Sequence, residues 1–142
     1  MTENKTPLNH CLYFTANNLA RVITRLAEQE FRITGLSPAH AFTLMTANNH
    51  PGICPKEMAE KLHLAPSTIT RFIDFLEYRG YLTREIEGKS SKIYPTQKGE
   101  TLQSDLKTAW HNLYINYSKK MGNNSGDELA CLIHQAIQKL DQ

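Results

Sequence analysis

Hydrophobic side chains recur at helical spacing along most of the chain, and two short stretches differ. The spacing of three and four residues predicts helices over 8–33, from Ser37 to the break at 48–52, over 55–62, from Pro66 to Gly80, from Thr96 to Gly122, and from Ser125 onward. The segments 81–87 and 92–96 are typical of paired strands, being rich in β-branched and aromatic residues. The pattern therefore predicts a mainly α-helical fold with one small β-hairpin.

The centre of the chain holds two short helices joined by a tight turn at Leu64 and Ala65. In the second helix, four apolar residues at i, i+3, i+4 and i+7 form a stripe that faces a core: Ile69, Phe72, Ile73 and Leu76. The opposite side presents side chains that suit base edges and phosphates in a major groove: Ser67, Thr68, Thr70 and Arg71. A surface helix whose hydroxyls only favour its first turn is the alternative.

The predicted hairpin follows this helix directly. Its expected tip, residues 88–91, carries or adjoins polar and basic side chains that suit phosphates or a minor groove: Lys89, Ser90, Ser91 and Lys92. Two lysines near an exposed turn also serve simply to protect an edge strand, which is the alternative. Helix, turn, helix and hairpin together predict a winged helix-turn-helix.

The ordered combination of these pieces resembles the multiple-antibiotic-resistance regulator (MarR) family of winged-helix transcription factors. The resemblance rests on a long first helix and on the segments 35–38, 58–62, 67–84 and 95–99, and it covers nearly the whole chain. It implies an obligate homodimer, mostly a repressor, that binds a pseudo-palindromic double-stranded DNA operator and is released by a small ligand, an oxidant or a metal. Glu87-Gly88-Lys89 stands where the family usually has Asp-x-Arg, so a lysine replaces the planar fork of the wing arginine.

The resemblance also implies a division of the chain into functional parts. A single domain over 1–142 would contain a DNA-binding core at 36–99, with dimerisation helices at 1–35 and 100–142. The apolar faces of the terminal helices favour pairing with a second copy, because little of the chain remains to cover them. A monomeric three-helix bundle formed by the first and the last two helices is the alternative.

Composition agrees with these expectations but decides less. The 16 basic and 14 acidic side chains give a formal net charge of +2, which is too small to indicate nucleic-acid binding by itself. The three cysteines show no CxxC spacing and favour a reducing compartment without a disulfide framework. A polar N-terminus and no long apolar run predict a cytoplasmic protein with no signal peptide and no membrane partner.

A regulatory site is harder to predict than the DNA-binding surface. The resemblance implies a ligand pocket between the dimerisation helices and the DNA-binding core, for which the candidate lining residues are Phe14, His40, Phe42 and Trp110. These residues also fit a core. Cys11 lies roughly where the peroxide-sensing branch of the family has its reactive cysteine, although a cysteine packed at a dimer interface is the alternative. Cys54 suits a helix start, and Cys131 suits a core.

Metal binding and catalysis find little support in the sequence. His40, His111, Glu28 and Glu30 lie in segments that converge in zinc-responsive relatives, but no HxxxH or CxxC pair anchors a site, and we expect no metal and no cofactor. No glycine-rich phosphate loop, HExxH or GxSxG is present, so we expect no enzyme. A winged helix used only for protein interaction remains an alternative. Arg71, Lys89 and Lys92 argue against it, because a protein-binding wing does not need basic residues on both helix and hairpin.

Overall fold

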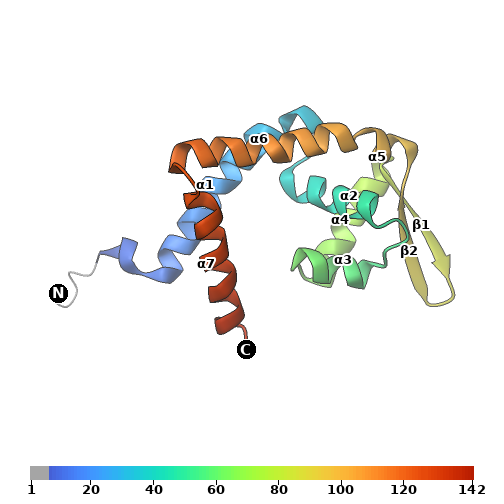
Figure 1. Ribbon diagram of the computed structural model, residues 1–142. Coiled ribbons are helices and arrows are strands. Elements are labelled where there is room, and N and C mark those ends of the chain that lie inside the picture. Colours follow the sequence, from blue (N-terminus) through green and yellow to red (C-terminus); the bar gives the residue numbers. More distant parts are fainter. Residues whose placement is uncertain (1–6) are drawn as a thin grey trace.

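The computed structural model describes residues 7–142 and confirms the mainly helical fold with one hairpin (Figure 1). In chain order the elements are the 3-10 helix η2 (Leu8–His10), α1 (Leu12–Glu30), the 3-10 helix η3 (Phe31–Thr34), α2 (Pro38–Asn49), α3 (Pro55–Leu62), α4 (Pro66–Tyr78), β1 (Leu82–Glu87), β2 (Ser90–Pro95), α5 (Gln97–Thr101), α6 (Gln103–Met121) and α7 (Ser125–Leu140). Residues 1–6, most of the polar N-terminus discussed above, lie outside the described residues. Within residues 7–142, none of the helices combines the length and the hydropathy needed to cross a membrane.

The hydrophobic core lies where α2, α3, α4, the base of the hairpin and α6 meet. Its largest buried side chains include Leu44, Met58, Ile69, Ile73, Leu76, Ile93 and Leu106. Three members of the predicted α4 stripe are completely buried, whereas Phe72 is only half-buried and lies beside the His40 ring. The apolar face of α4 therefore holds this helix against the core and leaves its other face to solvent.

Local sequence signals explain how the helices begin and end. Ser37 caps α2, since its hydroxyl accepts a hydrogen bond from the His40 amide, and Pro38 occupies the first turn. α3 ends at Leu62, and the next residue, His63, adopts a left-handed backbone conformation with φ of 55°. α4 then starts after Ala65, which offers no side-chain cap, with Pro66 fixing the first turn. The short connection sets the angle between α3 and α4.

The hairpin differs from the prediction at its tip. β1 and β2 pair antiparallel from Leu82 opposite Pro95 to Glu87 opposite Ser90. The turn is therefore only Gly88-Lys89, and the predicted tip residues Ser90 and Ser91 belong to β2. Gly88 has a φ of +61°, the conformation that a two-residue hairpin turn needs and that glycine adopts without strain.

The helix after the hairpin also differs from the prediction, because α5 and α6 replace one long helix. The break lies at Leu102. Thr96 caps the start of α5, since its hydroxyl accepts a hydrogen bond from the Gly99 amide. Gly99 packs so closely on the residue before β1 that a Cβ would lie 2.3 Å from the Tyr81 carbonyl oxygen. The Asn48 side-chain amide donates to the Gly99 carbonyl at 3.2 Å. These contacts fix the base of the hairpin against α2 and α5.

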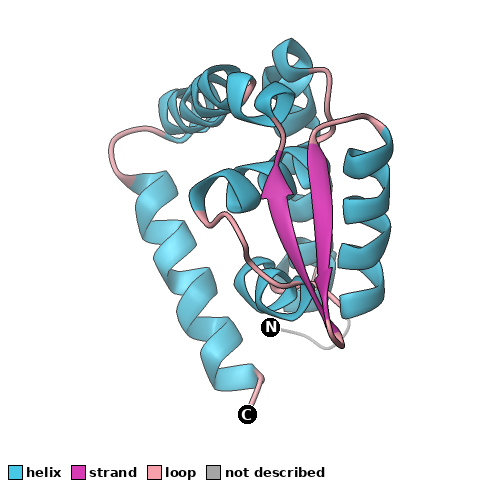
Figure 2. Cartoon of the chain, turned by 90° about the vertical axis from the view of Figure 1, so that its right-hand side faces the viewer, coloured by secondary structure: helices cyan, strands magenta, loops and turns pink. Residues whose placement is uncertain are grey.

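α7 stands away from the hairpin and the helices around it in both views (Figures 1 and 2). It contacts the rest of the chain chiefly through α6, where Gly126 packs on the Tyr117 ring and Asp127 accepts a hydrogen bond from the Tyr114 hydroxyl. One expectation is wrong here. Cys131 is exposed instead of lying in a core, because most of α7, including its apolar stripe, is left uncovered by the rest of the chain.

Candidate nucleic-acid interface

The outer face of α4 carries the predicted DNA-contacting side chains. Ser67, Thr70 and Arg71 are exposed, whereas Thr68 is half-buried. The Thr70 hydroxyl donates to the Pro66 carbonyl at 3.0 Å, which leaves its oxygen available as an acceptor. The Arg71 guanidinium lies 6.0 Å from the centre of the Phe72 ring, and no carboxylate among residues 7–142 forms an ion pair with it. The geometry thus presents one arginine and two hydroxyls from a rigid helix.

The hairpin brings the predicted wing residues to the side of this helix, but it gives them different environments. Lys89 lies at the tip and is exposed. Ser90 is exposed and donates to the Glu87 carbonyl at 3.0 Å, while Ser91 is half-buried. Lys92 pairs with the Glu87 carboxylate at 3.4 Å, so part of its charge is already balanced. Lys89 is therefore the stronger candidate for a phosphate contact.

Arg84 is a residue of this surface that the sequence analysis missed. Its guanidinium donates to the Glu77 carboxylate at 3.1 Å and pairs with Asp74, so that it links β1 to α4. One signal was available in the sequence, since alternation along β1 puts Arg84 on the same face of the strand as the buried Leu82. Both carboxylates belong to α4, so the hairpin and the helix are joined by charge as well as by packing.

The four candidate pocket residues do not gather around one cavity. The Phe42 and Trp110 rings meet edge to face, with centroids 5.4 Å apart. His40 lies against α4 instead, stacked on Phe75 at 4.1 Å. Phe14 lies on α1 and is 39% exposed. The structure therefore brings Phe42 and Trp110 together, and the ligand pocket stays a prediction.

His40 has an environment that changes its chemistry. Burial against the two phenylalanines and, to a smaller extent, the Arg79 charge hold its pKa below the ordinary value. Its Nδ1 lies 2.9 Å from the Ser37 hydroxyl oxygen, which suits a neutral ring. The histidine therefore supports the packing of α2 on α4 in its uncharged form.

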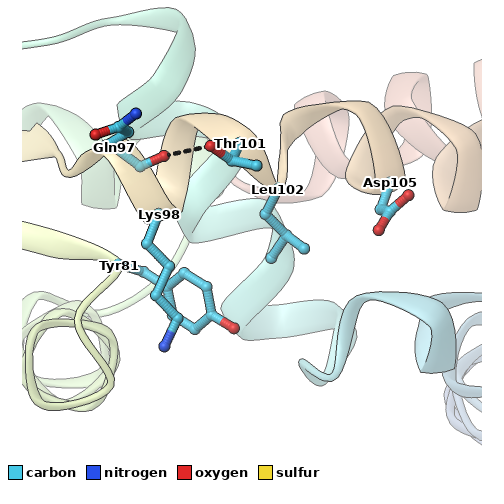
Figure 3. Close-up of a pocket in the computed structure, with 6 residues that line it drawn as sticks. All are labelled: Tyr81, Gln97, Lys98, Thr101, Leu102 and Asp105. Carbon is cyan, nitrogen blue, oxygen red and sulfur yellow. Dashed lines mark hydrogen bonds between the residues drawn. The ribbon is translucent and has the colours of Figure 1, made fainter.

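A shallow hollow of about 470 Å³ lies between the base of the hairpin and α6 (Figure 3). None of the candidate ligand residues lines it; the residues around it are Tyr81, Gln97, Lys98, Thr101, Leu102 and Asp105. The Lys98 ammonium lies 4.4 Å from the centre of the Tyr81 ring and donates to the Arg79 carbonyl at 2.7 Å. Lys98 thus fastens the C-terminus of α4 to the start of α5.

The remaining candidates for sensing chemistry lie apart from one another. Cys11 is exposed at the start of α1 and makes no side-chain cap bond. The Glu30 carboxylate accepts a hydrogen bond from the Asn116 side chain at 3.1 Å. Within the part of the chain that the structure describes, no three side chains of histidine, cysteine, aspartate or glutamate lie close enough to hold one metal ion.

Comparisons with known proteins agree with this geometry. Residues 36–91, which span α2 to the start of β2, match the model of the MarR family. The HTH-type transcriptional regulator YybA of Bacillus subtilis (strain 168), itself uncharacterized, is 28% identical over 127 residues, which cover 87% of this chain and 85% of YybA.

Solved structures share the fold over almost the full length. A transcriptional repressor CouR, bound to a 23-mer DNA duplex, superposes with a TM-score of 0.83 at 18% identity and covers 96% of this chain and 99% of its own. CouR from Rhodococcus jostii RHA1, bound to p-coumaroyl-CoA, gives a TM-score of 0.75 at 20% identity over 95% and 94% of the two chains. PcaV of Streptomyces coelicolor, in complex with its natural ligand, gives a TM-score of 0.82 at 17% identity over 97% and 98% of the two chains. Sequence motifs, fold and family model agree: residues 36–91 match the MarR family, and the chain as a whole has the winged helix-turn-helix fold of these structures.

Proposed function

We propose that this protein is a homodimeric transcriptional repressor that binds a pseudo-palindromic DNA operator and is released by a small-molecule ligand. The observation that carries the proposal is the outer face of α4, where Arg71 projects among hydroxyl side chains beside a hairpin with Lys89 at its tip. An α-helix of this kind fits a major groove, while a basic hairpin tip reaches the flanking phosphates or minor groove. The function is one of binding, and no enzymatic step is part of it. Cytoplasmic localisation belongs to the proposal, because a repressor works on the chromosome.

The DNA contacts divide between the two elements. Arg71, Ser67 and Thr70 contact base edges or the nearest phosphates, because they are exposed on the outer face of α4. Thr68, the remaining candidate, is half-buried and reaches DNA less easily than these three. On the hairpin, Lys89 supplies a phosphate contact. Ser90, Ser91 and Lys92 support the hairpin, with Lys92 contributing less charge because it pairs with Glu87.

Dimerisation supplies a second α4 helix, which contacts the other half-site of the operator. Large apolar side chains of the end helices are exposed in the single chain, among them Leu12, Leu19, Val22, Leu132, Ile133, Ile137 and Leu140. A second copy buries such a face, and each buried Leu or Ile side chain contributes about 1.5–3 kcal/mol. Two-fold symmetry then places two α4 helices about one turn of DNA, roughly 34 Å, apart.

A small ligand acts in this proposal by changing the angle between the end helices and the DNA-binding core. The edge-to-face pair of Phe42 from α2 and Trp110 from α6 supports it, because these rings lie where the two parts of the chain meet. CouR and PcaV, with the same fold, have structures with p-coumaroyl-CoA and with a natural ligand bound.

Binding to the DNA upstream of the protein's own gene tests the proposal. Purified protein is titrated against that fragment and against random DNA of equal length over a series of salt concentrations, and the stoichiometry is measured. We expect one dimer per site, selective binding and a steep loss of affinity with salt. A folded dimer that binds neither DNA at low salt would contradict the proposal and favour a protein-interaction role.

A further inference from the structure

An ion-pair triad, Asp74–Arg84–Glu77, joins the recognition helix α4 to strand β1 of the wing. The Arg84 Nη1 atom donates to Glu77 Oε1 at 3.1 Å, and Nη2 pairs with Asp74 Oδ1. Asp74 and Glu77 are three residues apart on one helix and therefore lie on one face, one turn apart. The planar guanidinium fork engages both carboxylates at once, which fixes orientation as well as distance.

Arg84 is also the last side chain of β1 that the body of the protein holds. Its side chain is 27% exposed, whereas the residues that follow in β1, Glu85 to Glu87, are all exposed. Across the hairpin Arg84 stands opposite the completely buried Ile93. Beyond this point the wing runs on to Lys89 without support from the body, over five residues or roughly 16 Å. A small rotation at Arg84 would therefore move the tip by a large amount.

We infer that Arg84 is a positioning residue, which sets the angle between wing and recognition helix and thereby the separation of the Lys89 and Arg71 contacts on DNA. The inference rests on the proposed function. It gives Arg84 no direct DNA contact, because both terminal nitrogens of its guanidinium already engage carboxylates, those of Glu77 and Asp74. The same pairing reduces the negative charge that these carboxylates would otherwise present to phosphates.

The variant Asp74→Asn distinguishes a positioning role of Arg84 from a purely electrostatic effect on DNA affinity. The change removes a negative charge near the DNA, so electrostatics alone predicts tighter binding to operator and random DNA alike. Positioning predicts instead that the ratio of operator to random affinity falls by about tenfold, the scale of one lost base contact. Arg84→Met should lower the ratio by a similar factor. The double variant should be no worse than either single change, because both break the same link.

Two further variants complete the experiment. Glu85→Gln is the matched control, since Glu85 is the exposed neighbour of Arg84 in β1 and lies outside the triad; its ratio should equal that of the wild type. Arg84→Lys should recover part of the ratio, because a lysine keeps the charge but loses the two-pronged geometry. Hydroxyl-radical footprints should show the wing's protection of the sugar-phosphate backbone shifted in Asp74→Asn, while protection of guanine N7 from dimethyl sulfate by α4 in the major groove stays in place. Thermal unfolding confirms that each variant is folded.

The outcomes separate this inference from the proposed function. Selective binding by the wild type with an unchanged ratio in Asp74→Asn would overturn the positioning role alone. A decrease of the salt slope by about 0.9 for each Arg84 in Arg84→Met, with no change in Asp74→Asn, would make Arg84 a phosphate contact and also overturn it. Absence of selective binding by the wild type would overturn the proposed function and this inference together.

Discussion

The DNA-binding core and the end helices use the same amphipathic pattern with opposite results. In the core, Leu44, Ile69 and Ile73 are completely buried by neighbours from the same chain. On α7, Leu132 is 62% exposed and Ile137 is 55% exposed, although their spacing along the helix is equally regular. A regular apolar stripe therefore predicts that a face is to be covered, but it does not say which chain covers it.

α6 shows the transition between the two regions within one helix. Leu106, Ala109 and Leu113 are buried against the rest of the chain, whereas Ile115 and Met121, nearer its C-terminus, are exposed. The helix begins inside the core and continues toward α7 (Figure 1). Folding of the core and association of the end helices are therefore separable properties. The following changes test that separation.

The largest effect is expected from placing two carboxylates on the α7 face. Leu132→Asp together with Ile137→Asp removes four apolar side chains per dimer from the proposed interface and buries charges there. We expect the dimer dissociation constant to rise by at least about a thousandfold, since each lost side chain contributes about 1.5–3 kcal/mol. Sedimentation equilibrium measures this constant.

The matched control for this change is Gln138→Asp, which adds a carboxylate on the opposite side of α7 and should leave the dimer intact. Circular dichroism should show unchanged helix content in the double variant if the core folds by itself. A dimer that persists in the double variant would show that another surface holds the two copies together.

Ile73→Ala tests the other region, where a single chain supplies all the packing. Ile73 is completely buried in α4, so the truncation leaves a cavity and should lower the free energy of unfolding by about 2–5 kcal/mol. Urea denaturation measures the loss, and Ser104→Ala on the exposed side of α6 is a surface control. A loss below about 1 kcal/mol would contradict the packing of α4 that the structure describes.

Arg71→Ala should affect DNA binding and leave both folding and dimerisation unchanged. The loss of an exposed arginine at a base edge should cost about 1–3 kcal/mol of operator affinity and relax the base preference at one position of each half-site. Fluorescence anisotropy with operator variants measures both effects. Arg25→Ala, the same truncation at an exposed position of α1, is the control. Unchanged affinity and selectivity would remove Arg71 from the DNA-contacting set.

Lys89→Ala should have a smaller and less selective effect. A phosphate contact from the wing tip carries no base information, so affinity for operator and random DNA should fall alike, and the salt slope should decrease by about 0.9 for each lysine lost. Lys92→Ala is the matched comparison and should change the slope less, because Lys92 is paired with Glu87 at 3.4 Å. A loss confined to one base pair would make Lys89 a base reader instead.

Much of the fold was predictable, because the residues that start and end helices and the apolar stripes that mark buried faces agree with the packing in the folded chain. Pro55, Pro66 and Gly80 mark where helices begin and end, and the stripe of α4 identifies its buried side. The outward face of α4 follows from the same periodicity. The exposure of Arg71 was therefore accessible from sequence, whereas its role on DNA remains a prediction.

The features that were missed depend on contacts between distant parts of the chain. Arg84 meets Asp74 and Glu77 only after α4 and β1 are placed, and the hairpin register decides that Ser90 and Ser91 are strand residues. Cys131 suits a core by residue type, but it is exposed because nothing else in the chain covers this part of α7. Local sequence does not say whether a helix face has a partner within the same chain.

The smallest expected effect concerns His40, which lies between α2 and the recognition helix. Burial against Phe72 and Phe75, and then the Arg79 charge, lower its pKa in the folded protein. The unfolded chain therefore binds this proton at a higher pH than the folded chain does. Stability from the neutral ring is complete above about pH 6.5 and is lost as the pH falls below that value. His40→Gln should therefore show a smaller decrease of Tm between pH 7.5 and pH 5.5 than the wild type, whereas His134→Gln, at an exposed site on α7, should keep the wild-type decrease. Equal decreases in wild type and His40→Gln would show that protonation of this ring does not oppose the packing of α2 on α4.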